Sequence, residues 1–273
     1  MKCNSYAKIA STFAFVALLL GVPASGLAAT ITWTNAAGGG WNTAANWSPN
    51  QVPGTNDTAV IQVAGISNAA VTVTLNSATT VGGITLGASG GGCGGGQVLS
   101  LAGQTLSLYG PLVIDACGHF AVDSGTLFGA TNIASVNGSF NWTAGFLAGT
   151  LTFATNSTLT INGPGNNDFP NCTLTNYGIV TWTNGLLRGG QSGTAIYNYG
   201  LWDIQGDLSF SSAYGGAVSF FNFGTLRKSA GTNTTQFSAA GLSSTGNVDV
   251  QTGVLYLPNG ATFSGGTVTN LGG

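Results

Sequence analysis

Residues 140–149 read FNWTAGFLAG and residues 180–189 read VTWTNGLLRG, so one pattern occurs twice, with Trp142 and Trp182 at equivalent places. An Asn-aromatic-Gly tripeptide occurs at 176–178, 198–200 and 222–224, and Ser-Thr-Gly follows at 244–246. Aligned on these segments, the chain divides into repeat units that begin at positions 118, 138, 158, 178, 200, 224 and 246. A unit this short cannot bury its own apolar side chains, but stacked neighbours can. The sequence therefore predicts an all-β fold, a parallel β-solenoid (β-helix) with about 20–24 residues per coil.

Most units open with an alternation of apolar and polar residues. The second and fourth positions after the start are apolar in Phe120, Val122, Phe140, Trp142, Val180, Trp182, Trp202, Ile204, Val248 and Val250. The residues between them are mostly polar, and a period of two predicts a strand with one face in the core. An antiparallel β-sandwich is the alternative. Its hairpins would give tight Asn-Gly turns at shorter, irregular spacing, and such turns do not dominate here.

Two units depart from this alternation. The unit at 158 places Leu159 and Ile161 one residue early, and the unit at 224 places Lys228 at the second inward position. Because a shift of one residue turns every side chain of a strand to the opposite face, we expect a bulge or a shifted boundary in each. Gly occupies the seventh position in six of the seven units, which predicts a corner between strands, and an inward Leu follows two residues later in four units.

The flanking regions have the same texture. Short β runs precede the first clear unit, at 71–75, 83–86, 98–101, 105–108 and 112–114, and indicate about four earlier coils. Asn270-Leu271-Gly272 resembles the opening tripeptides and follows Gly246 at slightly more than the usual spacing. We therefore expect residues 63–273 to form the repeats, with an eighth coil beginning at Gly272. The C-terminus is expected to be open or truncated, with unpaired strand edges that associate end to end with a second chain.

The composition excludes several classes of protein. Only 4% of the 273 residues are charged, and Glu is absent, which argues against a helical bundle. A hydrophobic content of 43% argues against disorder. Beyond the N-terminal segment the basic residues are Arg188, Arg227 and Lys228, too few for a surface that neutralises nucleic-acid phosphates.

Residues 1–29 have the pattern of a secretory signal peptide. Lys2 and Lys8 precede an apolar run from Ile9 to Leu20, and small residues follow, so we expect cleavage after Ala28 or Ala29. The run is short for a membrane-spanning helix, which needs about 20 residues, and no second long apolar segment follows. The mature protein is therefore expected to be exported, either secreted or on the cell surface or in the periplasm, without a transmembrane helix.

The mature chain keeps three cysteines, Cys93, Cys117 and Cys172. An exported protein can form disulfides, and an odd number leaves at least one thiol over. The separation of Cys93 and Cys117 is close to one repeat, so they are either a disulfide between neighbouring coils or small buried hydrophobic residues. With no Cys-x-x-Cys and a single His, neither a metal nor another cofactor is predicted.

Residues 30–62 differ from the repeats. Trp33, Trp41 and Trp47 lie close together in the sequence and predict a compact aromatic cap on the first coil. The same rings are the candidates for contact with a glycan, and the alternative is that they form the core of the cap. This opening, with Pro53 and Asp57 before a Val/Ile strand and with the later Asn-aromatic-Gly tripeptides, resembles exported bacterial β-strand-repeat proteins, among them autotransporter-like passengers. The resemblance implies a secreted or surface solenoid and transfers no catalytic residue.

The sequence assigns no catalytic residue. Asp123 and Asp203 lie four coils apart, or ~19 Å, too far to act on one bond, and a corner separates Asp203 from Asp207. His119 lies four positions from Asp115 and from Asp123, but the segment has the pattern of strand and turn, so an exposed turn histidine is favoured over a general base.

Three functions are weighed in this order. The first is a structural or adhesive solenoid without catalytic activity. The second is a carbohydrate-binding module, and the third is a β-helix enzyme acting on polysaccharides, which needs paired carboxylates. The expected partners are extracellular glycans or cell-envelope components.

Overall fold

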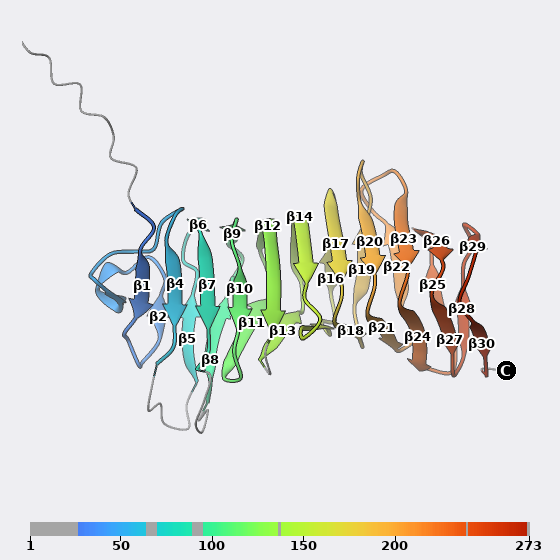
Figure 1. The fold of residues 1–273 in the computed structure, drawn as a ribbon, viewed down its shortest axis with the longest axis horizontal. Helices are drawn as coiled ribbons and strands as arrows, with labels where there is room; N and C mark the ends of the chain where they lie inside the picture. Colours follow the sequence, from blue (N-terminus) through green and yellow to red (C-terminus); the bar gives the residue numbers. More distant parts are fainter. Residues whose placement is uncertain (1–26, 64–69, 89–94, 136–137, 239, 272–273) are drawn as a thin grey trace, which may run out of the picture.

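The computed structural model describes residues 27–63, 70–88, 95–135, 138–238 and 240–271. Figure 1 shows a rod of stacked coils that runs from the N-terminal to the C-terminal end. Within these ranges the chain forms thirty strands and one short 3-10 turn at Ala44–Asn46. Strands of successive coils pair in parallel, and the antiparallel pair among the described strands is β1 (Thr30–Trp33) with β3 (Trp47–Ser48). The predicted all-β parallel solenoid is confirmed.

The described coils carry three faces. The first face is an eleven-stranded sheet made of β2 (Gly39–Gly40), β5 (Val71–Thr74), β8 (Gln97–Ser100), β11 (Gly118–Val122), β13 (Ser139–Trp142), β15 (Thr158–Ile161), β18 (Ile179–Trp182), β21 (Leu201–Gln205), β24 (Thr225–Ala230), β27 (Asn247–Val250) and β30 (Val268–Asn270). Three of its strands precede β11, where the sequence suggested about four coils.

The second and third faces form one larger sheet, because the long strands β12 (Thr126–Ser135) and β14 (Gly145–Phe153) pair along both. The second face also contains β6 (Thr79–Val81), β9 (Thr105–Leu108), β16 (Asn166–Asp168), β19 (Leu186–Gly189), β22 (Ser209–Ser212), β25 (Thr234–Phe237) and β28 (Val254–Tyr256). The third face contains β1, β4 (Thr58–Ile61), β7 (Gly83–Leu86), β10 (Leu112–Ile114), β17 (Cys172–Asn176), β20 (Ala195–Asn198), β23 (Val218–Asn222), β26 (Ala240–Ser244) and β29 (Ala261–Phe263).

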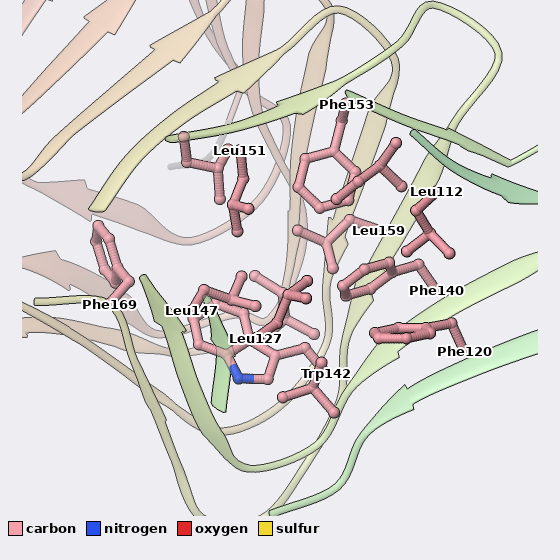
Figure 2. Packing of buried hydrophobic residues seen from close by; sticks show 14 of the residues in the cluster. Leu112, Phe120, Leu127, Phe140, Trp142, Leu147, Leu151, Phe153, Leu159 and Phe169 are labelled. Carbon is pink, nitrogen blue, oxygen red and sulfur yellow. The ribbon is translucent and has the colours of Figure 1, made fainter. Parts of the chain in front are cut away.

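The alternation read from the sequence sets the register of the first face. Phe120 pairs with Phe140 and Val122 with Trp142, and these predicted inward side chains are fully buried. Figure 2 shows Phe120, Phe140 and Leu159 following one another in the interior, and the first two rings are 4.9 Å apart. Equivalent positions of successive coils therefore form continuous apolar rows along the rod, which is how a short repeat obtains a core.

The two irregular coils show the expected departures. Phe140 pairs with Leu159, not with Thr160, so the boundary of that coil is shifted by one position. Between β21 and β24 the register shifts after Ile204, where Gln205 pairs with Ala230. The first coil thus has a shifted boundary with a regular ladder, and the second has a register irregularity that follows Lys228 and leaves this residue at its inward position.

Lys228 stays at its inward position and is fully buried. Its ammonium donates to the backbone oxygens of Gly206 at 3.0 Å and Ala230 at 2.8 Å, and to Asp207 Oδ1 at 3.0 Å. The hydrogen bond from Lys228 holds the pKa of Asp207 below its usual value. A buried ammonium is tolerated here because each of its three protons has an acceptor.

The corner glycines mostly have the predicted role. Gly125, Gly145, Gly185, Gly231 and Gly253 have φ between +65° and +113°, whereas Gly165 is not among the residues with positive φ. At Gly125 a Cβ would lie 2.3 Å from the backbone oxygen of Gln104 in the previous coil. Both the backbone angle and the close approach of coils therefore require glycine at that corner.

A row of polar side chains also runs along the interior, at the ends of the third-face strands β17, β20, β23 and β26. Asn176 donates to Asn198 Oδ1, and Asn198 donates to Asn222 Oδ1, each at 2.8 Å. Asn222 donates in turn to Ser244 Oγ at 3.0 Å, and all four residues are fully buried. The Asn of each opening tripeptide is thus an inward residue that joins one coil to the next.

The C-terminal coil corrects one prediction. Val268 pairs with Val248, so the last described coil begins at Gly266, and the expected start at Gly272 is wrong. Gly272 itself lies outside the described residues. Phe263 and Val268 occupy inward register positions but are 45% and 59% exposed, so the apolar rows are uncovered at this end.

The cysteines separate into two states. Cys117 is disulfide-bonded, whereas Cys172 carries a free, fully buried thiol. Burial raises the pKa of the Cys172 thiol to about 12. The predicted partnership of Cys117 with Cys93 falls on a residue outside the described ranges.

Candidate functional site

The three tryptophans proposed as glycan contacts lie in the interior. Trp33, Trp41 and Trp47 are 2%, 0% and 1% exposed. Trp47 meets the other two rings edge to face, at 4.9 and 4.8 Å between centroids. A sugar stacks on an open ring face, and these faces are covered by protein, so the structure favours the cap-core interpretation of this cluster.

The other charged residues weighed in the sequence do not converge. His119 lies on β11, not in a turn, and its Nδ1 is 2.8 Å from Ser139 Oγ. Asp115 accepts from Gln62 at 3.2 Å, and Asp123 accepts from Ser100 at 2.6 Å. Neither carboxylate is hydrogen-bonded to His119, so no relay of nucleophile, base and acid is assembled at this place.

One charged cluster lies on the outer side of the first face. Asp203, Arg227 and Asp249 occupy equivalent positions of three successive strands. Arg227 binds Asp203 through Nε and Nη2, both at 2.9 Å. Burial works to raise the pKa of Asp203, but hydrogen bonds from Arg227 and Gln205 outweigh it and keep the pKa below its usual value. Asp203 is therefore a charged partner of Arg227, not a carboxyl group that could supply a proton near neutral pH.

A second cluster lies on the second face, where β16 and β19 pair. Arg188 binds Asp168 through Nε at 2.6 Å and Nη2 at 2.8 Å, and the guanidinium carbon lies 5.8 Å from the ring centroid of Tyr214. Phe146 meets Tyr214 at 6.3 Å. The amide oxygen of Asn166, turned toward the guanidinium, accepts from Nη2 at 3.1 Å. We call Phe146, Asn166, Asp168, Arg188 and Tyr214 the arginine cluster.

The protonation states of the arginine cluster suit recognition better than proton transfer. The hydrogen bond to Asp168 raises the pKa of Arg188 further, and burial followed by hydrogen bonding to Asp168 raises the pKa of Tyr214. Neither group can accept a proton near neutral pH. What the cluster offers is two half-buried aromatic rings beside a fixed, partly exposed guanidinium.

Exposed aromatic rings gather at the corner where the third face ends. Tyr177, Tyr199 and Phe223, the central residues of the three Asn-aromatic-Gly tripeptides, are 44%, 44% and 42% exposed. Their rings stack at 4.9 and 4.7 Å, with interplanar angles of 15° and 12°. Beside them Tyr197 and Phe221 stack at 4.9 Å. We call the row of Tyr177, Tyr199 and Phe223 the aromatic strip.

The sequence carried a signal for each of these groups. Asp168 and Arg188 are separated by one repeat length, and Asp203, Arg227 and Asp249 share the third position after their coil starts. The tripeptides were used to set the repeat, but the outward direction of their aromatic residues could not be assigned without the geometry of the corner. Side chains that share a repeat position meet in space in a solenoid, and this rule would have found the Asp203 cluster, the aromatic strip and the pair of Asp168 with Arg188, but not Tyr214.

Comparisons with protein-family models, with curated proteins and with solved structures find no match. In the described part of the chain no helix has the length and hydrophobicity needed to span a bilayer. Among the same residues, no three His, Cys or Asp side chains are grouped as they would be around a metal ion.

Proposed function

We propose that the protein is an exported structural β-solenoid that adheres to extracellular or cell-envelope polysaccharide through the aromatic strip. The observation that carries the proposal is the strip itself, three stacked aromatic rings that are each more than two-fifths exposed on a rod whose other large aromatic side chains are mainly in the core. Exposed apolar rings in a contiguous row are a common mark of an interaction surface. Export rests on the pattern of residues 1–29 and on the resemblance to exported repeat proteins.

The test uses a variant that removes the three rings of the aromatic strip and keeps the backbone of the corner. Thr245 occupies the next place in the same row and makes the same backbone bond, from its N–H to the Asn222 oxygen at 2.9 Å, so threonine is compatible with this position. The triple variant Tyr177→Thr, Tyr199→Thr, Phe223→Thr is compared with wild type in sedimentation with insoluble polysaccharides and with cell-wall preparations. Tyr109→Thr, at an exposed tyrosine outside the strip, is the matched control.

Retention of wild-type binding by the triple variant would contradict adhesion through the strip. If wild-type protein binds none of these surfaces, the adhesive part of the proposal fails and a purely structural role is left.

A second candidate is a carbohydrate-binding module, which the arginine cluster favours. An aromatic ring beside a guanidinium and an amide is a suitable set of groups for the apolar face and the hydroxyls of a sugar. In a screen of soluble oligosaccharides, this candidate predicts binding that Tyr214→Ala abolishes and that the strip variant keeps. An enzyme acting on polysaccharide stays the third candidate, and release of new reducing ends from a substrate panel would establish it.

End-to-end association is also a proposal. The uncovered Phe263 and Val268, beside an open apolar hollow of about 350 Å³, support it. Sedimentation of the exported chain at increasing concentration tests it, and a monomer at every concentration would contradict it.

A further inference from the structure

The first described residues are held by a buried carboxylate. The backbone N–H of Ala29 donates to Asp57 Oδ1 at 3.0 Å, and the carbonyl oxygen of Ala29 accepts from the N–H of Thr58 at 2.8 Å. The second oxygen of Asp57 accepts from the N–H of Gly54 at 2.8 Å. Ala29 is thus bonded on both sides to the segment that leads into β4, the strand next to β1 in Figure 1.

Asp57 is a buried carboxylate that has no cationic partner among the residues described by the structure. Its residue is 8% exposed, and the ion pairs found among the described residues involve Asp168, Asp203 and Asp207, not Asp57. Two neutral N–H groups satisfy its oxygens but do not balance its charge. Buried carboxylates are normally paired with a positive group, because removing a charge from water is costly.

The chain on the other side of Ala29 is open to solvent. Leu27 is 93% exposed, and Ala28 and Ala29 are exposed as well. The peptide bond between Ala28 and Ala29 is therefore accessible to a protease, while the nitrogen of Ala29 remains hydrogen-bonded to Asp57.

The sequence separates the two cleavage positions that the leader pattern allows. Signal peptidases prefer small residues at the last and third-last positions of the leader. Cleavage after Ala28 places Ala28 and Gly26 there, whereas cleavage after Ala29 places Leu27 at the third-last position. Cleavage after Ala29 would also remove both hydrogen bonds of that residue.

We propose that the leader is cut between Ala28 and Ala29 and that the new α-ammonium of Ala29 forms an ion pair with Asp57. Hydrolysis by a signal peptidase adds water across the peptide bond, leaving a carboxylate on Ala28 and a protonated amine on Ala29. The amide N–H that now binds Asp57 becomes a charged donor at the same place, and a charge-assisted hydrogen bond is about twice as strong as a neutral one. Maturation therefore tightens the first coil. The location of the cut rests on the proposed export, but the pairing does not.

The pairing is tested on chains made without export, as fusions from which a protease releases the desired first residue. Three proteins are compared: one beginning at Ala29, the same protein acetylated at its N-terminus, and one beginning at Ala28. Acetylation keeps an N–H on Ala29 and removes its charge, as in the uncut chain. The readout is hydrogen exchange of the backbone amides of β1 and β4, with β21 as a distant control.

We expect the chain with the free amine at Ala29 to show about tenfold slower exchange in β1 and β4 than the other two, and equal exchange in β21. In an Asp57→Asn background the three chains should be equal. Equal exchange of the free and acetylated chains at wild-type Asp57 would overturn the pairing, and so would an advantage that persists in Asp57→Asn.

The advantage also has a defined pH dependence. Pairing raises the pKa of the α-amine above its ordinary range of about 7.7–8.0, so the advantage is present below that range and disappears as the pH rises through the raised value. Tyr109 lines the adjoining hollow and is the same in every chain, so any contribution from it cancels in the comparison.

The position of the cut is tested separately by exporting the full-length chain from a bacterial host and sequencing its N-terminus. Ala29 as the first residue is the expected result, and Thr30 would overturn the assignment. An uncut chain would contradict export but leave the exchange experiment decisive for the pairing.

Discussion

Replacement of Trp182 by Ala measures how much one inward aromatic residue contributes to the solenoid. The indole is fully buried, between Ile161 and Ile204 in its row, and its N–H donates to the Gly185 oxygen at 3.2 Å. A buried Trp removes ~200 Å² from water, which at ~25 cal/mol per Å² gives about 5 kcal/mol as an upper estimate. Large aromatic-to-alanine changes in cores cost about 3–5 kcal/mol, so we expect a loss of about 4 kcal/mol.

The matched control is Thr181→Ala, at the preceding position on the outer side of the same strand, where surface substitutions stay within about 0.5 kcal/mol. Both variants are unfolded in guanidinium chloride, with the slope of the transition compared so that a change in cooperativity is not mistaken for a change in stability. Because coils contact mainly their neighbours, exchange of the amides in β15, β18 and β21 locates the loss. Small and equal effects of the two substitutions would refute the assigned register.

Three further outcomes follow from buried polar groups. Asn198→Ala should lower stability by about 2–4 kcal/mol in denaturant titration, because it leaves Asn176 and Asn222 each without one buried partner; a loss below about 0.5 kcal/mol would show that the row is not stabilising. Lys228→Met should destabilise by a few kcal/mol in the same assay, because two backbone oxygens lose their donor, and a neutral or stabilising result would mean that desolvation of the ammonium outweighs its three bonds. The Cys172 thiol has a pKa of about 12 against a reference value of 9.0, so it should resist alkylation at pH 8 until the protein unfolds. Stability should fall as the pH rises from about 9 toward 12, because in that range the thiol is ionised only in the unfolded chain. Rapid labelling of the native protein at pH 8 would contradict the burial of Cys172.

The sequence was most informative where a single physical pattern acts alone. Alternation with a period of two, recurring in five of the seven repeat units, was enough to place Phe120, Trp142 and Trp182 in the core and to identify the two units that depart from it. These features depend on which apolar residues are buried, and the alternation of apolar and polar residues in the sequence shows this directly.

Prediction from the sequence was weaker where a conclusion needs both the type of a residue and the direction of its side chain. The C-terminal tripeptide suggested a coil start at Gly272, but strand register, set by Val248 and Val268, outweighs a resemblance in one tripeptide. The tryptophans at 33, 41 and 47 look alike in the sequence as core or as contact residues, and their burial in the cap favours the core role. The exposed direction of Tyr199 depends on the inward direction of Asn198, which only the corner geometry reveals.

Parallel pairing also determines how the rod responds to a pulling force. The hydrogen bonds between coils run along the rod, so tension applied to its ends pulls coil from coil and detaches them in sequence from the loaded end. Each detached coil can lengthen the tether by roughly 60–80 Å, at about 3.4 Å for every residue released. The buried asparagine row and Lys228 add bonds between particular coils, so extension should proceed in unequal steps. A rod built this way yields gradually under load, and its neighbouring coils can re-form when the load is removed.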